Sequence, residues 1–322
     1  MKKIPFMSFF LMTLMAAAVP AVEKSTSPAD EFPKLKLTGF ARVRYTVDMT
    51  ENKPDGFSLA ALRFGLTGNI SQDFSYTLTL EGSNTDNENR KLIYDAYIDT
   101  TLIRNFRVRF GQFKYGFGLE QTTPEAELDF INKSDVVSNL IKPNRDIGVQ
   151  AARDIPLGSV RSTLTVAVIN GSGSNLDDEN NRKSVVGRLA VNPFKGVQIG
   201  GSYYDGTVGT ADKKTRAGLD LKLEISRLTV KAEYLYGEDK SIAKEGYYLA
   251  VGYSVLPAAV LLVRYDFWNS NRNVENVDAS RWTFGVNYFF GKRILWRTNY
   301  ERKRETPSVR NDLFMTQLQV LF

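Results

Sequence analysis

The chain has 322 residues, a formal net charge of +6, and neither cysteine nor histidine. These absences exclude disulfides, thiolate chemistry, Ser-His triads, HExxH zinc sites and histidine general bases, so we expect no enzyme and no cofactor. Hydrophobic residues make up 43% of the chain, yet no apolar run beyond the N-terminus reaches the about 20 residues that a membrane-spanning helix needs.

Residues 1–21 have the pattern of a secretory signal peptide. Lys2 and Lys3 precede the apolar run Phe6–Met15, and small residues up to Ala21 offer a cleavage site. A disordered or interfacial N-terminus is the alternative. Removing the two lysines lowers the net charge from +6 to +4. The basic residues are scattered, which argues against nucleic acid as a partner. Residues 22–33 then form a short N-terminal segment before the body of the protein, residues 34–322.

From Lys34 to Phe322, apolar and polar residues alternate along most of the chain. In residues 34–47, for example, Leu35, Leu37 and Val43 lie on one face and Lys36 and Arg42 on the other. The same pattern occurs in residues 74–81, 216–225, 228–236, 282–290 and 314–322. Strict alternation predicts β-strands with one oily and one polar face.

The connections between the alternating segments are of two kinds. Short turns are expected near 71–73, 103–105, 156–158, 193–196, 226–227, 257 and 291–292. Longer polar loops are expected at 50–56, 84–90, 116–144, 171–182, 206–214, 237–244, 269–278 and 303–309. Short and long alternate, as in outer-membrane barrels, and eight long loops imply about sixteen strands.

The fold predicted is therefore all-β: a transmembrane antiparallel up-and-down β-barrel. A soluble β-sandwich also alternates, but it uses Greek-key connections. The aromatic-rich oily faces favour the barrel, because barrels place aromatic residues in girdles at both membrane interfaces. These features predict the outer membrane of a Gram-negative bacterium, with outer-membrane lipid around the barrel.

Residue parity predicts which side chains face the lumen. Charged residues are expected inside, because an Arg or Lys facing the bilayer midplane costs about 2–4 kcal/mol. The inward basic set is Lys34, Lys36, Arg42, Arg44, Arg63, Arg107, Arg109, Arg188, Arg216, Lys222, Lys231, Arg264 and Arg297; the inward acidic set is Glu81, Asp95, Asp99, Asp146, Asp220, Glu224, Glu233, Asp266 and Glu301. Such an interior requires water, and a barrel of about sixteen strands is wide enough for an aqueous channel.

The connection 116–144 is exceptionally long and carries both charge signs. A long connection of this kind is usually functional, and here it is expected to fold into the lumen and narrow it. An external loop folded over the rim is the alternative. Charges at a constriction set ion selectivity. The constriction-loop acids are Glu125, Glu127 and Asp129, and the residues expected to line the pore and attract anions are Arg42, Arg44, Arg63, Arg107, Arg109, Lys133, Lys142 and Arg145.

The chain ends on an alternating strand, residues 314–322, whose last residue is Phe322. A terminal aromatic residue on an amphipathic strand resembles the signal that the outer-membrane assembly machinery reads. An ordinary last strand is the alternative.

Three motifs resemble the phosphate-selective porin O and P family. They are RFGQFKYGFGLE at 109–120, LDF at 128–130 and RDIGVQ at 145–150. The resemblance implies sixteen strands, a third loop folded inward, a homotrimer and an anion-preferring channel. The family's phosphate-specific members carry an arginine ladder and a lysine cluster, whereas Glu125, Glu127 and Asp129 here precede only Lys133.

The function predicted is a water-filled channel for passive diffusion of small solutes, with a preference for anions such as phosphate. One alternative is a channel that binds phosphate, polyphosphate or another anion. Another is a general porin whose lumen charges are structural salt bridges. A barrel enzyme or adhesin, with no channel function, is the third.

Overall fold

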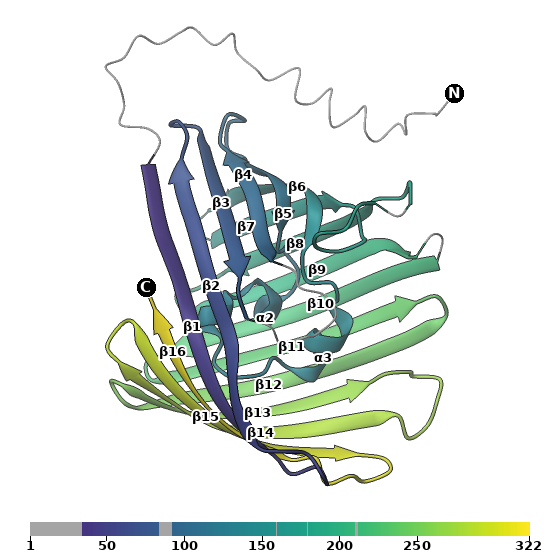
Figure 1. The fold of residues 1–322 in the computed structure, drawn as a ribbon. Coiled ribbons are helices and arrows are strands. Elements are labelled where there is room, and N and C mark those ends of the chain that lie inside the picture. Colours follow the sequence, from purple (N-terminus) through teal and green to yellow (C-terminus); the bar gives the residue numbers. More distant parts are fainter. Residues whose placement is uncertain (1–33, 84–91, 159, 179, 210–211) are drawn as a thin grey trace, which may run out of the picture.

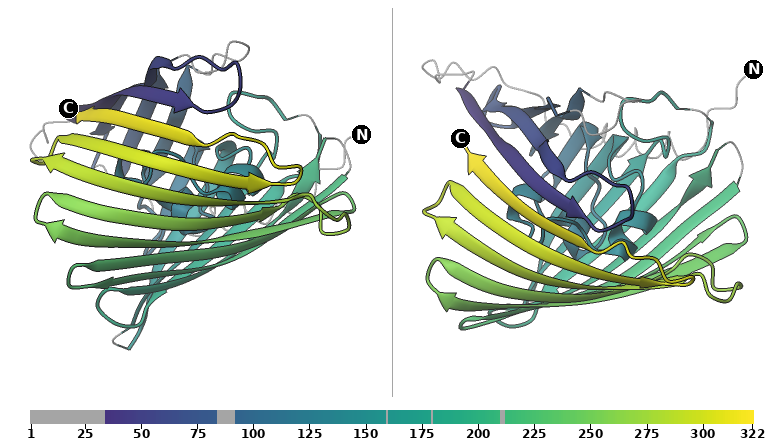
Figure 2. Two further views of the ribbon diagram at one scale, coloured as in Figure 1. Left: turned by 90° about the horizontal axis from the view of Figure 1, so that it is seen from below. Right: turned by 60° about the horizontal axis from the view of Figure 1, so that its bottom comes forward.

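The computed structural model describes residues 34–83, 92–158, 160–178, 180–209 and 212–322; the predicted signal peptide lies outside them. Within these residues the chain forms a closed barrel of sixteen antiparallel strands, each paired with its neighbours in sequence (Figure 1). The barrel closes where β1 pairs with β16 (Figure 2). The all-β barrel predicted from alternation is confirmed.

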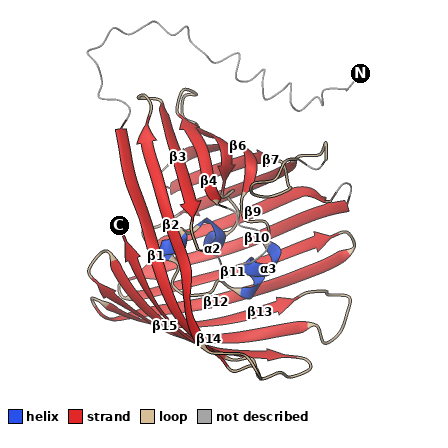
Figure 3. Ribbon diagram, in the orientation of Figure 1, coloured by secondary structure: helices blue, strands red, loops and turns tan. Residues whose placement is uncertain are grey.

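The first eight strands are β1 (Lys34–Asp48), β2 (Gly56–Asn69), β3 (Phe74–Glu81), β4 (Ile93–Thr100), β5 (Arg107–Phe113), β6 (Asp146–Leu157), β7 (Val160–Ile169) and β8 (Ser184–Asn192). The second eight are β9 (Val197–Val208), β10 (Asp212–Ile225), β11 (Leu228–Asp239), β12 (Ile242–Leu256), β13 (Ala259–Asn269), β14 (Asp278–Phe290), β15 (Ile294–Glu305) and β16 (Leu313–Leu321). The helices of the described chain are α2 (Leu119–Thr122), the 3₁₀ turn η1 (Glu125–Glu127) and α3 (Asp135–Leu140), all between β5 and β6 (Figure 3). None is long and apolar enough to cross a membrane.

Side-chain exposure follows the alternation along each strand. On β10, Leu219 is 66% exposed and its neighbour Asp220 only 5%. On β14, Trp282 is 44% exposed whereas Thr283 is fully buried. The apolar face therefore points outward, where lipid replaces water, and the polar face points into the barrel.

Two predicted long loops are in fact tight hairpins. The expected loop 237–244 is mostly strand, because β11 and β12 pair as far as Asp239 and Ile242. The expected loop 206–214 is likewise mostly paired strand, with Gly206 opposite Lys214. Polar residues caused the error: Lys244 and Asp239 form a cross-strand ion pair at 2.8 Å rather than an irregular loop. Six of the seven predicted short turns lie between strands; in the seventh, 156–158, Pro156 and Leu157 are still paired at the end of β6.

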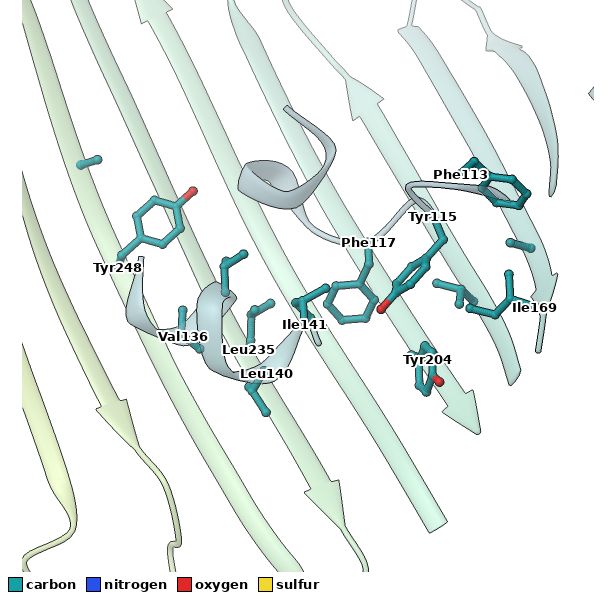
Figure 4. Close-up of a cluster of buried hydrophobic side chains, with 14 of the residues drawn as sticks. Phe113, Tyr115, Phe117, Val136, Leu140, Ile141, Ile169, Tyr204, Leu235 and Tyr248 are labelled. Carbon is teal, nitrogen blue, oxygen red and sulfur yellow. The ribbon is translucent and has the colours of Figure 1, made fainter. Parts of the chain in front are cut away.

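The inner face is more apolar than alternation predicts. Residues of the β5–β6 connection and of the wall strands form one buried cluster (Figure 4). Phe117, Leu140 and Ile141 from the connection meet Tyr204 and Leu235 from the wall. Each large apolar side chain buried in this way contributes about 1.5–3 kcal/mol. This cluster fixes the connection against one side of the barrel.

Candidate pore constriction

The connection between β5 and β6, residues 114–145, crosses the inside of the barrel (Figures 1 and 2). Its helix α3 contacts β11, β12 and β13. Ser134 begins α3 by accepting a hydrogen bond from the amide of Val137. We call this connection the inner segment. Three sets of polar contacts, described next, attach it to the wall.

The first attachment is at Glu233 on β11. Its carboxylate, only 2% exposed, accepts hydrogen bonds from the amides of Leu119 and Glu120, both at 3.1 Å. Ser202 accepts a third from the amide of Gly118, at 2.9 Å. Gly118 has φ of 66°, and a Cβ there would lie 1.9 Å from Glu233 Oε1. Only glycine therefore allows this close approach.

The second attachment uses two buried arginines. Arg264 donates to the carbonyls of Asn132 and Lys133, and Arg281 also donates to the carbonyl of Lys133. Both guanidinium groups contact Asp266, at 2.8 and 3.3 Å. Arginine suits this role because its five donors reach several acceptors at once.

The third attachment holds the 3₁₀ turn. Arg42 donates to the carbonyl of Glu125, and Arg297 donates to the carbonyl of Ala126 at 3.0 Å. Gln319 on β16 accepts from both arginines and donates to the carbonyl of Ala126 at 3.1 Å. The backbone of η1 is thus fixed against β1, β15 and β16.

Two cavities flank the 3₁₀ turn. One of about 840 Å³ is lined by residues near the short-turn ends of the strands, including Phe40, Tyr97 and Arg109. The other, of about 510 Å³, is lined by residues nearer the long loops. Among the described residues, Glu125 alone lines both. Glu125 therefore lies between the two cavities, where the inner segment meets the wall.

Basic side chains surround Glu125. Arg63 Nη2 lies 2.7 Å from its carboxylate and Arg42 Nη1 lies 3.8 Å away. Tyr94 donates its hydroxyl to the other carboxylate oxygen. The guanidinium carbons of Arg63 and Arg145 lie 3.6 and 3.4 Å from the centre of the Tyr94 ring. Stacking on an aromatic ring fixes the two arginines in position.

The charges inside this cluster influence one another. Burial and the charge of Lys133 lower the pKa of Lys114 to about 7. Burial alone would raise the pKa of Glu125. The charge of Arg63, the hydrogen bond from Tyr94 and the charge of Lys133 outweigh burial and lower it to about 2. Glu125 is therefore ionised at neutral pH, whereas Lys114 is close to its midpoint.

The structure brings some of the sequence-predicted site residues together at the constriction: Arg42, Arg44, Arg63, Arg109, Arg145, Lys133 and Glu125 line the two cavities there. Arg109 binds Asp99 through two hydrogen bonds, at 2.8 and 2.9 Å. Arg44 binds Gln317, and Lys133 binds Gln121.

Other predicted residues lie elsewhere. Arg107 is exposed at the short-turn end of β5. Lys142 is exposed, although it lines the smaller cavity. Glu127 is exposed on η1, and Asp129 pairs with Lys231 at 2.5 Å. These four do not contact Glu125.

Sequence reasoning missed Lys114 and Tyr94. Lys114 belongs to the GQFK motif and donates to the carbonyl of Thr123 at 2.9 Å. Tyr94 precedes the inward Asp95, so parity would place it outward. A β-bulge, where pairing shifts between Thr79 and Leu80, turns Tyr94 inward instead.

A family model described as phosphate-selective porin O and P matches residues 38–226, more than half of the chain. The chain belongs to this family. It is an outer-membrane porin, and its location is the outer membrane of a Gram-negative bacterium. No curated protein matches the chain.

Solved structures share the barrel of this porin. OmpT of Vibrio cholerae lacking loop L8 has a TM-score of 0.67 and 13% identity, over 90% of this chain and 99% of that one. The outer-membrane channel DcaP of Acinetobacter baumannii has a TM-score of 0.65 and 13% identity, over 92% and 99%. OprB of Pseudomonas putida has a TM-score of 0.66 and 10% identity, over 90% and 94%. At such identity these likenesses establish the fold alone.

Proposed function

We propose that this porin is a passive channel that prefers small anions, which pass from one cavity to the other beside Glu125. The observation that carries the proposal is the surplus of positive charge at the constriction. Arg44, Lys114, Lys133 and Arg297 all hydrogen-bond neutral oxygens there. Within the described residues, none of the four forms a salt bridge.

A surplus of fixed cations acts on every ion that enters. In a narrow polar passage the field is focused, because the surrounding barrel has a low dielectric constant. Anions are therefore concentrated and cations repelled, and charged side chains at a constriction set selectivity in this way. Because none of the four is paired in a salt bridge with a described residue, their positive charge is available to a passing anion.

A general porin with structural lumen charges is the second candidate. It is favoured by the wall strands β2–β5, where arginines pair with carboxylates. Arg63 contacts Glu81 at 2.6 Å, and Arg109 contacts Asp99 at 2.8 Å. Such pairs stiffen the wall and cancel each other's field.

Reversal potentials separate the two candidates. We expect purified porin in planar bilayers under a KCl gradient to give a reversal potential that is shifted from zero toward the equilibrium potential of chloride. Replacing chloride with phosphate, and potassium with a large cation, then ranks the solutes. The double variant Lys133→Gln with Arg44→Gln is expected to lose most of the preference. A reversal potential at zero, or shifted toward the equilibrium potential of potassium, would reject anion preference in the wild-type protein. No conductance at all would reject the channel.

The remaining sequence predictions become proposals on the same basis. We propose a signal peptide at residues 1–21, a homotrimer, and recognition of the C-terminal Phe322 by the assembly machinery. A structure of OmpT of Vibrio cholerae is described as a trimer form. The N-terminal sequence of the mature protein tests the first, and its mass in detergent tests the second. Export of a variant that lacks Phe322 tests the third.

A further inference from the structure

The carboxylate of Glu125 makes the contacts that a free carboxylate ion would make at the same place. One oxygen contacts Arg63 at 2.7 Å and Arg42 at 3.8 Å, and the other accepts from the Tyr94 hydroxyl. These donors come from β1, β2 and β4, which are remote in sequence from Glu125. They surround a residue that lines both cavities.

The donors do not depend on Glu125 for their positions. Arg63 is also held by Glu81 at 2.6 Å and by stacking on Tyr94. Arg42 is also held by Gln319 at 2.8 Å. A preformed set of donors keeps its affinity for a carboxylate even when the native side chain leaves.

The backbone at Glu125 is held by contacts that do not involve its carboxylate. Arg42 fixes the carbonyl of Glu125, and Arg297 and Gln319 fix the carbonyl of Ala126. Lys133 lies close enough to lower the pKa of Glu125, and its ammonium donates to the amide oxygen of Gln121 at 3.0 Å. It therefore offers the displaced carboxylate a second cationic partner.

We propose that Glu125 is a built-in competing ligand, which occupies an oxyanion site formed by Arg42, Arg63 and Tyr94 that a permeating small carboxylate takes over. The proposal rests on the anion channel proposed above and names its solute class. A monocarboxylate matches the charge and the two oxygens of the group it displaces. Competition with Glu125 keeps the solute from being retained, so passage stays fast.

The test compares Glu125→Gln with Glu127→Gln. Both residues lie on η1 and lose the same charge, but Glu127 is exposed and touches none of the three donors. Acetate is titrated into a constant chloride solution while the single-channel chloride current is recorded. Glu125→Gln is expected to lower the half-blocking concentration of acetate by at least about tenfold, the lower end of what a close charge pair contributes. Glu127→Gln is expected to change it less than about twofold, since an exposed charge is screened.

A second variant separates occupancy of the site from net charge and covers the case in which Glu125→Gln fails to fold. Glu125→Asp keeps the charge but withdraws the carboxylate by one methylene, so acetate block is expected to strengthen here too. Equal effects of Glu125→Gln and Glu127→Gln, or an unchanged block in Glu125→Asp, would overturn the competing-ligand proposal while leaving an anion-selective wild type intact. Block by phosphate without block by acetate would overturn the carboxylate class. Cation preference in the wild type would instead reject the proposed channel function itself.

Discussion

Replacing Gly118 with alanine should release the inner segment from the wall. The new Cβ would lie 1.9 Å from Glu233 Oε1, so the carboxylate must move away from the two amides it accepts from. A hydrogen bond makes a net contribution of about 0.5–1.5 kcal/mol. Losing both costs up to about 3 kcal/mol, which makes local opening up to about 100-fold more frequent. Backbone strain at positive φ adds about 1–3 kcal/mol.

Hydrogen exchange measures this opening directly. The amides of Leu119 and Glu120 should exchange faster in Gly118→Ala than in wild type, by up to about 100-fold. Gly158→Ala is the matched control: Gly158 has φ of 64°, but its Cβ would meet nothing within 4 Å. It carries the strain without the clash. Exchange at 119–120 that is no faster in Gly118→Ala than in Gly158→Ala would refute the role of Glu233.

Three further predictions concern the wall, the pH response and closure. Arg281→Met leaves two buried carboxylates, on β13 and β15, without the guanidinium they share. The free energy of unfolding should therefore fall by about 3–5 kcal/mol, and the barrel should unfold at a lower temperature in a gel-shift assay. Arg272→Met, at an exposed position, should leave the unfolding temperature unchanged. Because Lys114 has a pKa of about 7, it is charged below and neutral above that pH. Anion preference should therefore decrease as the pH rises from 6 to 8. If the reversal potential of Lys114→Met still changes over this pH range, the prediction is wrong. Gly39→Ala would place a Cβ 2.5 Å from the ring of Phe322, so the yield of closed, heat-modifiable barrel should drop.

The barrel could be predicted because its constraint is local. Lipid outside and water inside act on every strand separately, so the identity of neighbouring residues such as Leu219 and Asp220 reveals which face is which. Hairpin length was less predictable. Charged residues such as Asp239 and Lys244 are found in loops and also in strands that extend past the membrane. Whether they pair across two strands decides between the two structures.

The constriction could be predicted only in part, because its geometry joins residues that are remote in sequence. The inward arginines followed from parity. The role of Tyr94 did not, since a bulge on the neighbouring pair reverses its face. The different roles of Glu125 and Glu127 also depend on tertiary structure. The two residues belong to one short turn and have the same charge, but of the two it is Glu125 that contacts the arginines.

Two neighbouring stretches of the wall differ in how their arginines are paired, and this difference follows from strand register. On β2–β5, arginines face carboxylates directly across the pairing: Arg63 opposite Glu81 and Arg109 opposite Asp99. Those charges cancel within the wall. On β1, β15 and β16, arginines instead face glutamines, with Arg42 opposite Gln319 and Arg44 and Arg297 opposite Gln317.

Glutamine fixes an arginine without neutralising it, so β1, β15 and β16 keep their positive field. The 3₁₀ turn is attached to these strands, and there Glu125 meets Arg42. The same carboxylate contacts Arg63 on β2, so it lies between the paired and the unpaired arginines. Substituting a charge on β2–β5 should therefore alter stability more than selectivity, whereas substituting Glu125 should alter selectivity more than stability.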